Sequence, residues 1–298
     1  MRLVTRGDLD GLTCAILIST CEDIEEIQLA HPQDITNNRL HLGEADILAN
    51  LPYSPGVGKW FDHHVLTSAS VNAPEGFEGR YALAPSAARV VYEHYVNDHP
   101  QIQRYERLLA ETDRLDSANL SLDDVLTPAD YILLGFTLDP RTGLGDYHNY
   151  FHQCVTWVMN ETLEETLKRP EVTERVERIR KSDEAFCDIT SEHSRVEGNV
   201  IVTDFRALEP PPVGNRFIVY TLFPEANISM RLHWGPGRSS VAAAIGHSIF
   251  NRTSHTNVGE LLGKYGGGGH KGAGTALLPV ASADEKIQEL IDTMKRDG

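Results

Sequence analysis

The chain has 298 residues and a formal net charge of −16 at pH 7, and its length favours two domains. Long nucleic acids are held mainly by arrays of Lys and Arg on phosphates. This acidic balance therefore argues against tracking along a long nucleic acid and favours a small ligand if that ligand carries phosphate. No apolar run approaches the roughly 18 residues of a membrane span, and charges and glycines interrupt the start of the chain, so we expect a cytoplasmic protein with no membrane partner.

The first part of the chain alternates predicted strands and helices. A strand is predicted within residues 1–5, followed by the polar turn GDLDG and by a helix that begins at Leu12. Further strands are predicted at 27–31 and in the run that ends at Trp60–Asp62. Strand, loop and helix in this order open an α/β domain, in which loops after the strands bind ligands. We therefore predict an α/β fold whose N-terminal domain has a mainly parallel sheet flanked by helices.

Helices are predicted to dominate the middle of the chain. Ser86 is a candidate N-cap for a helix over 86–99, and a second helix is predicted over 101–117. A third begins at Thr127, with Pro128 in its first position.

Residues 171–194 are dense in charges of both signs and form a predicted solvent-exposed helix, which Pro170 breaks or restarts. Beyond it, segments 199–205, 216–223 and 226–234 have the composition of strands, 240–250 fits a strand or a helix, and 281–296 is an amphipathic helix. The predicted organisation is a first domain at 1–170, a helical linker at 171–194 and a smaller α/β domain at 195–298.

Two motifs in the first domain carry groups that bind metal ions. Asp8 and Asp10 lie two residues apart in a glycine-flanked turn after the first strand, and carboxylates are the ligands that hard cations prefer. The alternative is an Asp-rich turn that only begins a helix. Asp62, His63 and His64 follow one another at the end of a predicted strand. Mixed Asp and His ligands suit Mn²⁺, Fe²⁺ or Zn²⁺, and we favour a ligand role here.

A third motif, YGGGGHKGAGT, begins at Tyr265 in the second domain. Successive glycines let backbone N–H groups approach an anion closely, and His270 and Lys271 add charge beside them. The alternative is a flexible linker, which fits poorly because the strand-like TALLPV follows at once. The motif therefore favours a site for a phosphate or a carboxylate.

These pieces, in this order, resemble the DHH phosphoesterase superfamily, which includes RecJ-type exonucleases, small-RNA nucleases (nanoRNases), cyclic-dinucleotide phosphodiesterases and family II pyrophosphatases. Residues 62–64 match the motif that names it, VTRGDLDGLTCAIL resembles the first motif, and ADILANLPY resembles the second, with Asp46 as its acidic residue. ETDRLDS resembles the fourth, with Asp113 as the better match and Asp116 as a nearby alternative. GGGGHKGAG resembles the glycine-rich signature of the associated substrate-binding domain, and ISMRLHW resembles the strand that carries its phosphate-binding arginine, Arg231.

The resemblance implies two Mn²⁺ ions, with Mg²⁺ as an alternative, in a cleft between the domains. It assigns Asp46 as the bridging ligand, Asp8 to one ion, and Asp10, His63 and Asp113 to the other. Asp62 would orient these ligands and His64 would face the scissile phosphate. The predicted substrate-binding residues are Arg6, Arg231, Arg252, Gly267, Gly268, Gly269, His270 and Lys271. For Arg252 and the nearby Asn257, a surface loop is the alternative.

One position departs from the family pattern. Two residues before its first aspartate the family usually has a third ligand, His or Asp, and this chain has Arg6. A guanidinium has no free acceptor and cannot ligate a metal. The first ion is therefore expected to bind weakly or to be lost, and Arg6 to contact a substrate phosphate instead.

Two functions follow from the resemblance. The first is a Mn²⁺-dependent phosphodiesterase that hydrolyses short 5′-phosphorylated oligonucleotides or a dinucleotide. The second is a nucleotide-binding regulatory module that lost one metal site. A polyphosphatase or pyrophosphatase is a third reading, and the sequence leaves open whether a second copy of the chain is a partner.

Overall fold

The computed structural model describes residues 1–64, 75–138 and 147–298, which divide into two compact units. Unit 1 is Met1–Leu120 with Thr127–Ile179, and unit 2 is Ser121–Leu126 with Arg180–Gly298. The predicted charged helix is α9, Pro170–Glu192, which begins at the proline, and the division between the units falls inside it. No feature of the sequence indicated that residues 121–126 belong with the second unit.

Unit 1 contains a five-stranded, entirely parallel sheet in the order β2-β1-β3-β4-β5, which confirms the predicted α/β class. Its elements are β1 (Arg2–Thr5), α1 (Leu9–Cys21), β2 (Glu26–Leu29), α2 (Pro32–Thr36), β3 (Asp46–Ala49), β4 (Lys59–Asp62), β5 (Gly79–Tyr81), α3 (Ala87–Tyr95), η1 (Pro100–Tyr105), α4 (Glu106–Asp116), α6 (Asp130–Leu138), α7 (Tyr147–Asn160) and α8 (Leu163–Leu167).

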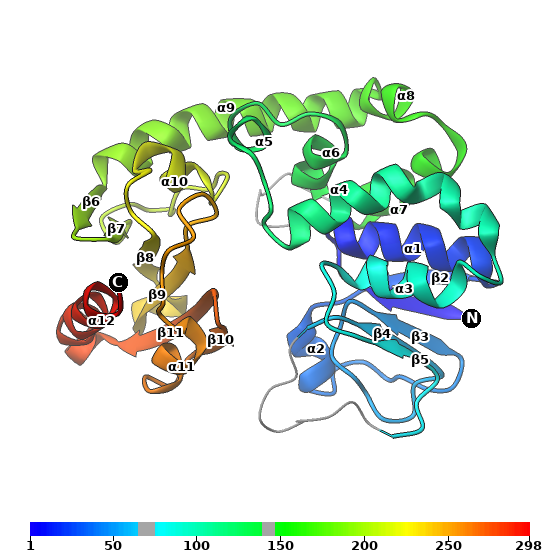
Figure 1. Cartoon of the computed structure of the whole chain (residues 1–298), viewed down its shortest axis with the longest axis horizontal. Coiled ribbons are helices and arrows are strands. Elements are labelled where there is room, and N and C mark those ends of the chain that lie inside the picture. Colours follow the sequence, from blue (N-terminus) through cyan, green and yellow to red (C-terminus); the bar gives the residue numbers. More distant parts are fainter. Residues whose placement is uncertain (65–74, 139–146) are drawn as a thin grey trace. The chain divides into compact units, whose positions relative to one another are not determined.

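Alternate side chains of these strands pack on opposite faces of the sheet. Leu3, Ile47 and Phe61 join the large core formed with α1, α3, α4, α6 and α7 (Figure 1). Val4 and Trp60 belong to a smaller apolar cluster on the other face. Because both faces of the sheet are packed in this way, the ends of its strands are the part that a ligand can reach.

Unit 2 contains a six-stranded mixed sheet in the order β10-β11-β9-β8-β7-β6. Its elements are α5 (Leu122–Leu126), β6 (Ser194–Glu197), β7 (Val200–Asp204), α10 (Ile218–Leu222), β8 (Ile228–Trp234), η3 (Pro236–Arg238), β9 (Ser240–His247), α11 (Val258–Gly263), β10 (Gly268–His270), β11 (Ala273–Pro279), η4 (Val280–Ser282) and α12 (Ala283–Asp297). Segment 240–250 therefore contains a strand, whereas 216–223 was wrongly predicted as one and forms the short helix α10.

The faces of the second sheet differ in character. Ile228, Met230 and Leu232 of β8 are buried in the core with α11 and α12. Because side chains alternate along a strand, Arg231 and His233 lie on the opposite face. Among the residues that the structure describes, no helix is both long and apolar enough to cross a membrane.

Candidate metal centre and substrate-binding residues

The predicted metal-binding motifs gather at the carboxyl ends of three neighbouring strands of unit 1. Asp8 and Asp10 follow β1, Asn50 follows β3, and the Asp-His-His motif lies at the end of β4. These strands are adjacent in the order β1-β3-β4. Ligands of open α/β sheets bind at this edge, so the topology alone brings these polar side chains together.

Asp10 lies in the first turn of α1, where its side chain is buried against the start of α3. Its two carboxylate oxygens accept hydrogen bonds from the backbone N–H groups of Ala87, at 2.9 Å, and Ala88, at 2.8 Å. Ser86 caps the same helix, as predicted, by accepting a bond from the Arg89 N–H. Burial, together with the nearby charge of Asp8, raises the pKa of Asp10 to about 6.

His63 turns one ring nitrogen toward two carboxylates. Its Nδ1 lies 3.0 Å from the Ala84 carbonyl oxygen and donates to it, which leaves a lone pair on Nε2. That Nε2 lies 3.3 Å from Asp116 Oδ2 and 3.8 Å from Asp10 Oδ2. It is buried and has no hydrogen-bond partner in the described part of the chain. A lone pair facing two carboxylates is unfavourable unless a proton or a metal cation lies between them.

Asp116 completes this group at the end of α4. The ligand atoms of Asp10, His63 and Asp116 all lie within 4.8 Å of one another. Burial and the charges of Asp10 and Asp8 raise the pKa of Asp116 well above its ordinary value. A divalent cation would relieve this repulsion and suits two carboxylates and a neutral imidazole. These three residues therefore fit one metal ion.

Asp62 holds His64 in place beside this group. Asp62 is buried, and its Oδ1 lies 2.7 Å from His64 Nδ1 and accepts a bond of 2.9 Å from the His63 backbone N–H. Burial disfavours the charged imidazole, but the hydrogen bond and charge of Asp62 outweigh it and raise the pKa of His64. The His64 side chain is 45% exposed, so part of the ring is open to a ligand.

Asp46 is not in the group, which corrects the prediction that it bridges two ions. It is the first residue of β3 and pairs with Arg2, the first residue of β1. Asp46 therefore lies where these parallel strands begin, whereas Asp8 and Asp10 lie beyond the end of β1. Arg2 binds both of its oxygens, Nε to Oδ1 at 2.8 Å and Nη2 to Oδ2 at 2.9 Å. The residue of this motif that reaches the metal-binding edge is Asn50, which the sequence reading missed.

Asp113 is likewise outside the group, and Asp116, the alternative named for this motif, lies in it. Asp113 accepts a bond of 2.6 Å from the Ser86 hydroxyl and is bound by the Arg89 guanidinium, with Nε at 3.0 Å. It therefore fastens α4 to the start of α3. Asp116, one turn further along α4, faces His63 instead.

The surroundings of Asp8 do not fit a second ion. Its Oδ1 accepts bonds from the Gly11 backbone N–H at 3.0 Å and from Asn50 Nδ2 at 3.1 Å. Its Oδ2 lies 3.2 Å from Arg6 Nε. Donors thus surround this carboxylate, and the guanidinium adds a fixed positive charge where a cation would have to bind.

In unit 2, the glycine-rich motif is not a linker but a β-hairpin at the edge of the sheet. Gly268–His270 form β10, which pairs antiparallel with β11, and the Gly272 N–H donates to His270 Nδ1 at 3.2 Å in the turn. A Cβ on Gly267 would lie 2.5 Å from the Thr275 carbonyl oxygen, and one on Gly269 would lie 2.2 Å from that of Ala273. These two glycines are therefore required by packing.

A substitution at Gly268 can test whether this hairpin binds substrate without disturbing its packing. A Cβ at Gly268 meets nothing within 4 Å, whereas Gly269 has a φ of +153° and no room for a side chain. We expect Gly268→Ala to keep the melting temperature and to raise KM for a phosphorylated substrate about 10-fold, because a methyl group would keep the anion from the backbone amides. Gly269→Ala should instead destabilise unit 2. An unchanged KM in Gly268→Ala would argue that this strand binds no substrate.

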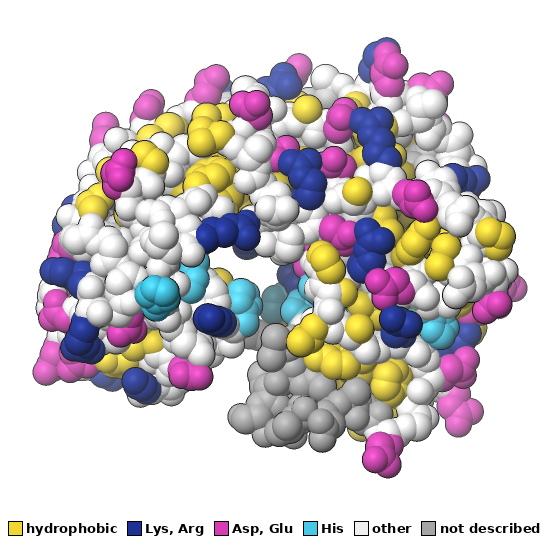
Figure 2. Space-filling view, viewed as in Figure 1, with side chains coloured by type: hydrophobic (Ala, Val, Ile, Leu, Met, Phe, Trp, Pro, Cys, Tyr) yellow, Lys and Arg dark blue, Asp and Glu magenta, His cyan; other side chains and the backbone are white. Residues whose placement is uncertain are grey.

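Of the remaining predicted substrate-binding residues in unit 2, Lys271 directly follows β10, whereas Arg231 and Arg252 lie outside the hairpin. Arg231 is half-buried on β8, whereas Arg252 and Lys271 are exposed, and Arg252 Nε donates to the Ile249 carbonyl at 2.9 Å. Asn257 caps α11 by accepting a bond from the Glu260 N–H. On the face drawn in Figure 2, Lys and Arg side chains are interspersed with Asp and Glu, which suits a small substrate better than a long polyanion.

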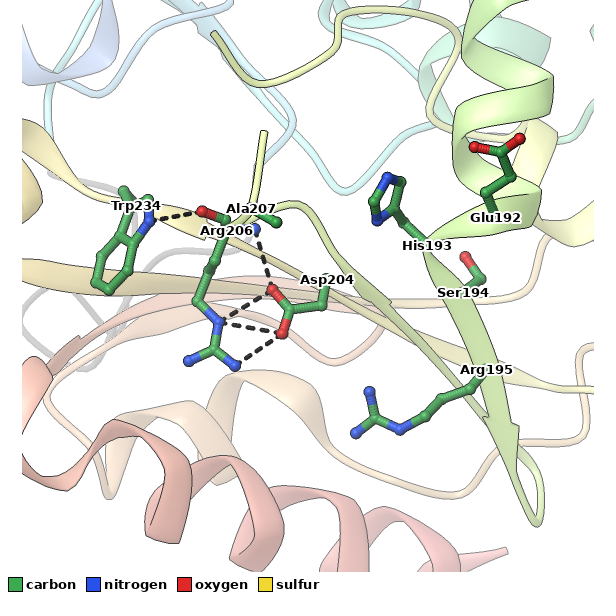
Figure 3. Close-up of a pocket in the computed structure, with 8 residues that line it drawn as sticks. All are labelled: Glu192, His193, Ser194, Arg195, Asp204, Arg206, Ala207 and Trp234. Carbon is green, nitrogen blue, oxygen red and sulfur yellow. Dashed lines mark hydrogen bonds and ion pairs between the residues drawn. The ribbon is translucent and has the colours of Figure 1, made fainter. Parts of the chain in front are cut away.

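Unit 2 also contains an open pocket of about 540 Å³ (Figure 3). Within it the Arg206 guanidinium is bound by Asp204, and its Nη1 lies 2.7 Å from Asp284 Oδ1. Arg195, also in the lining, pairs with Glu197 at 2.9 Å. Since both guanidinium groups already have carboxylate partners, and since the described lining includes none of the predicted substrate-binding residues, the pocket is not assigned to the substrate.

Comparison with known proteins agrees with the fold. A pGpG-specific phosphodiesterase, PggH from Vibrio cholerae, is 38% identical, with a TM-score of 0.82 over 100% of this chain and 99% of that one. RecJ from Thermus thermophilus, in complex with Mn²⁺, is 14% identical, with a TM-score of 0.62 over 99% of this chain and 52% of RecJ. The DHH domain of a member of a family of ribosomal proteins is 13% identical, with a TM-score of 0.67 over 99% of this chain and 86% of that one. No protein-family model matches the chain, and no curated protein matches it.

The fold and the site together define a two-unit phosphoesterase with acidic and histidine residues placed to bind metal. The chain belongs to the DHH phosphoesterase superfamily, as its motifs indicated, and is a hydrolase of phosphoester bonds.

Proposed function

We propose that this protein is a Mn²⁺-dependent phosphodiesterase that hydrolyses short 5′-phosphorylated nucleotides, with the linear dinucleotide pGpG as its substrate. The observation that carries the chemistry is the buried His63 Nε2, which faces Asp10 and Asp116 without a hydrogen-bond partner among the described residues. The substrate is supported by the full-length likeness to the pGpG-specific phosphodiesterase. The net charge of −16 also favours a short ligand.

The catalytic roles proposed for unit 1 follow from its side chains. Asp10, His63 and Asp116 would hold the ion, and Asp62 fixes the ring of His64 through the bond to Nδ1. A bound divalent ion supplies Lewis acidity at the phosphate and makes water a better nucleophile at neutral pH. His64, fixed in this way and 45% exposed, would in its protonated form, which the raised pKa favours, donate from Nε2 to a phosphate oxygen.

Unit 2 would bind the part of the substrate that does not react. Arg231 and His270 carry the groups that recognise phosphate and ribose, and the exposed amides of the edge strand β10 can approach an anion. Contacts of this kind position a short substrate and so raise the rate of the step at the metal.

The test is hydrolysis of pGpG by the full chain loaded with Mn²⁺, with the products separated by chromatography. Addition of water across the bridging phosphodiester should convert each pGpG into two GMP molecules. EDTA should abolish turnover, and added Mn²⁺ should restore it. Asp116→Asn serves as the inactive control, with pyrophosphate and longer oligonucleotides as competing substrates.

Two outcomes would contradict the proposal. If pGpG binds tightly to the metal-loaded protein but is not hydrolysed, the chain is a binding module, as the pairing of Arg6 with Asp8 would then suggest. If pyrophosphate is hydrolysed much faster than pGpG, the phosphodiester is not the natural bond.

A further inference from the structure

Within the described part of the chain, both carboxylate oxygens of Asp8 face hydrogen-bond donors. Gly11 and Asn50 donate to one oxygen, and Arg6 Nε lies 3.2 Å from the other. Asp10 and Asp116, in contrast, face the lone pair of His63. Asp10 and Asp116 therefore face a ring nitrogen, whereas Asp8 already has a cationic group, Arg6, beside it.

Arg6 and Asn50, the two residues whose side chains contact Asp8, cannot replace carboxylate or imidazole ligands. Arg6 is permanently charged and presents no acceptor. Asn50 is neutral and turns its Nδ2 donor toward Asp8. The carboxylate that could have supplied a further charge, Asp46, lies at the other edge of the sheet with Arg2. Among the described residues, Asp8 belongs to neither of the two groups whose ligand atoms could hold an ion, and a divalent ion beside it would have a guanidinium at close range, which repels it.

Arg6 is positioned to do more than neutralise Asp8. Its side chain is 35% exposed, so part of the guanidinium remains open to a ligand. It lies close enough to Asp116 and His64 to act electrostatically on both. A guanidinium in this place offers a phosphate several N–H donors in a fixed plane.

We propose that the chain binds a single divalent ion, at Asp10, His63 and Asp116, and that Arg6 takes the place of a second ion as the positive charge facing the substrate phosphate. This inference rests on the proposed function, because the phosphate belongs to the proposed substrate. The metal count can nevertheless be measured without any substrate.

The experiment measures Mn²⁺ bound per chain by elemental analysis and by calorimetric titration, with electron paramagnetic resonance to distinguish an isolated ion from a coupled pair. The wild-type protein should bind one ion and give the spectrum of an isolated Mn²⁺. The double variant Arg6→His/Asn50→Asp should bind a second ion and give the spectrum of a coupled pair, because it restores two ligands beside Asp8.

The matched control is Arg39→His/Asn37→Asp, which makes the same charge change at exposed positions around the end of α2 and should still bind one ion. The single variant Arg6→Gln should keep one ion and weaken binding of a hydrolysis-resistant pGpG analogue about 10- to 100-fold. Thermal unfolding of each variant verifies that it is folded.

Two bound ions in the wild-type protein, or a folded double variant that still binds one, would overturn the inference. So would Arg6→Gln binding the analogue as tightly as the wild type does. These failures differ from failure of the proposed function: a wild-type protein that hydrolyses pGpG with two ions loses only the inference, and one that binds a single ion without hydrolysis loses only the function.

Discussion

Asp116→Asn is expected to remove the bound metal ion and to lower pGpG hydrolysis by at least about 100-fold, a loss typical of damage to a metal centre. The amide that replaces the carboxylate is neutral, so His63 and Asp10 would be left with too little negative charge to hold a divalent ion. The measurements are Mn²⁺ content after dialysis and the initial rate of GMP release.

Asp113→Asn is the matched control, because it makes the same chemical change one turn earlier on α4. We expect it to keep the metal ion and most of the activity, since Asp113 binds Ser86 and Arg89 instead of facing His63. Its cost should appear in the free energy of unfolding, about 1–3 kcal/mol, because the half-buried Arg89 loses its charged partner. If Asp113→Asn lost the metal and Asp116→Asn retained it, the roles of the two aspartates would be reversed.

The sequence predicted the elements that depend on local pattern. The strand at the start of the chain, the Ser86 cap and the helix that begins at Pro170 are all present, since each rests on residues close together in sequence. The helix α10 was missed because five residues are too few to distinguish helical from strand periodicity.

Two of the predicted metal ligands were wrong, and only one of these two errors required the three-dimensional structure to correct. Asp113 and Asp116 are three residues apart on one helix, and which of them faces His63 depends on how α4 is rotated against α1 and α3. The position of Asp46, in contrast, could have been predicted from the sequence. It begins the run DILA, whereas ligands of parallel sheets gather where strands end, and Asn50 stands at that end.

His64→Asn is expected to lower kcat by about 100-fold while leaving the bound Mn²⁺ unchanged, the loss typical of removing one preorganised donor to a developing charge. The Asn amide can still bond to Asp62 in place of Nδ1, but it is too short to reach a phosphate from the Nε2 position. Since His63 and the carboxylates of the metal group are untouched, a retained ion with lost turnover would separate contact with substrate from contact with metal.

The control for this variant is His41→Asn, at an exposed histidine before β3, which should have wild-type kcat, KM and metal content. Loss of Mn²⁺ in His64→Asn would mean that His64 is itself a ligand, through the grouping of Asp62, His63 and His64 whose ligand atoms also lie within 4.8 Å of one another. Full activity in His64→Asn would remove this residue from catalysis and leave Arg6, whose charge acts on His64, as a candidate to contact the reacting phosphate. The pair of measurements therefore assigns the second histidine of the motif to metal, to substrate or to neither.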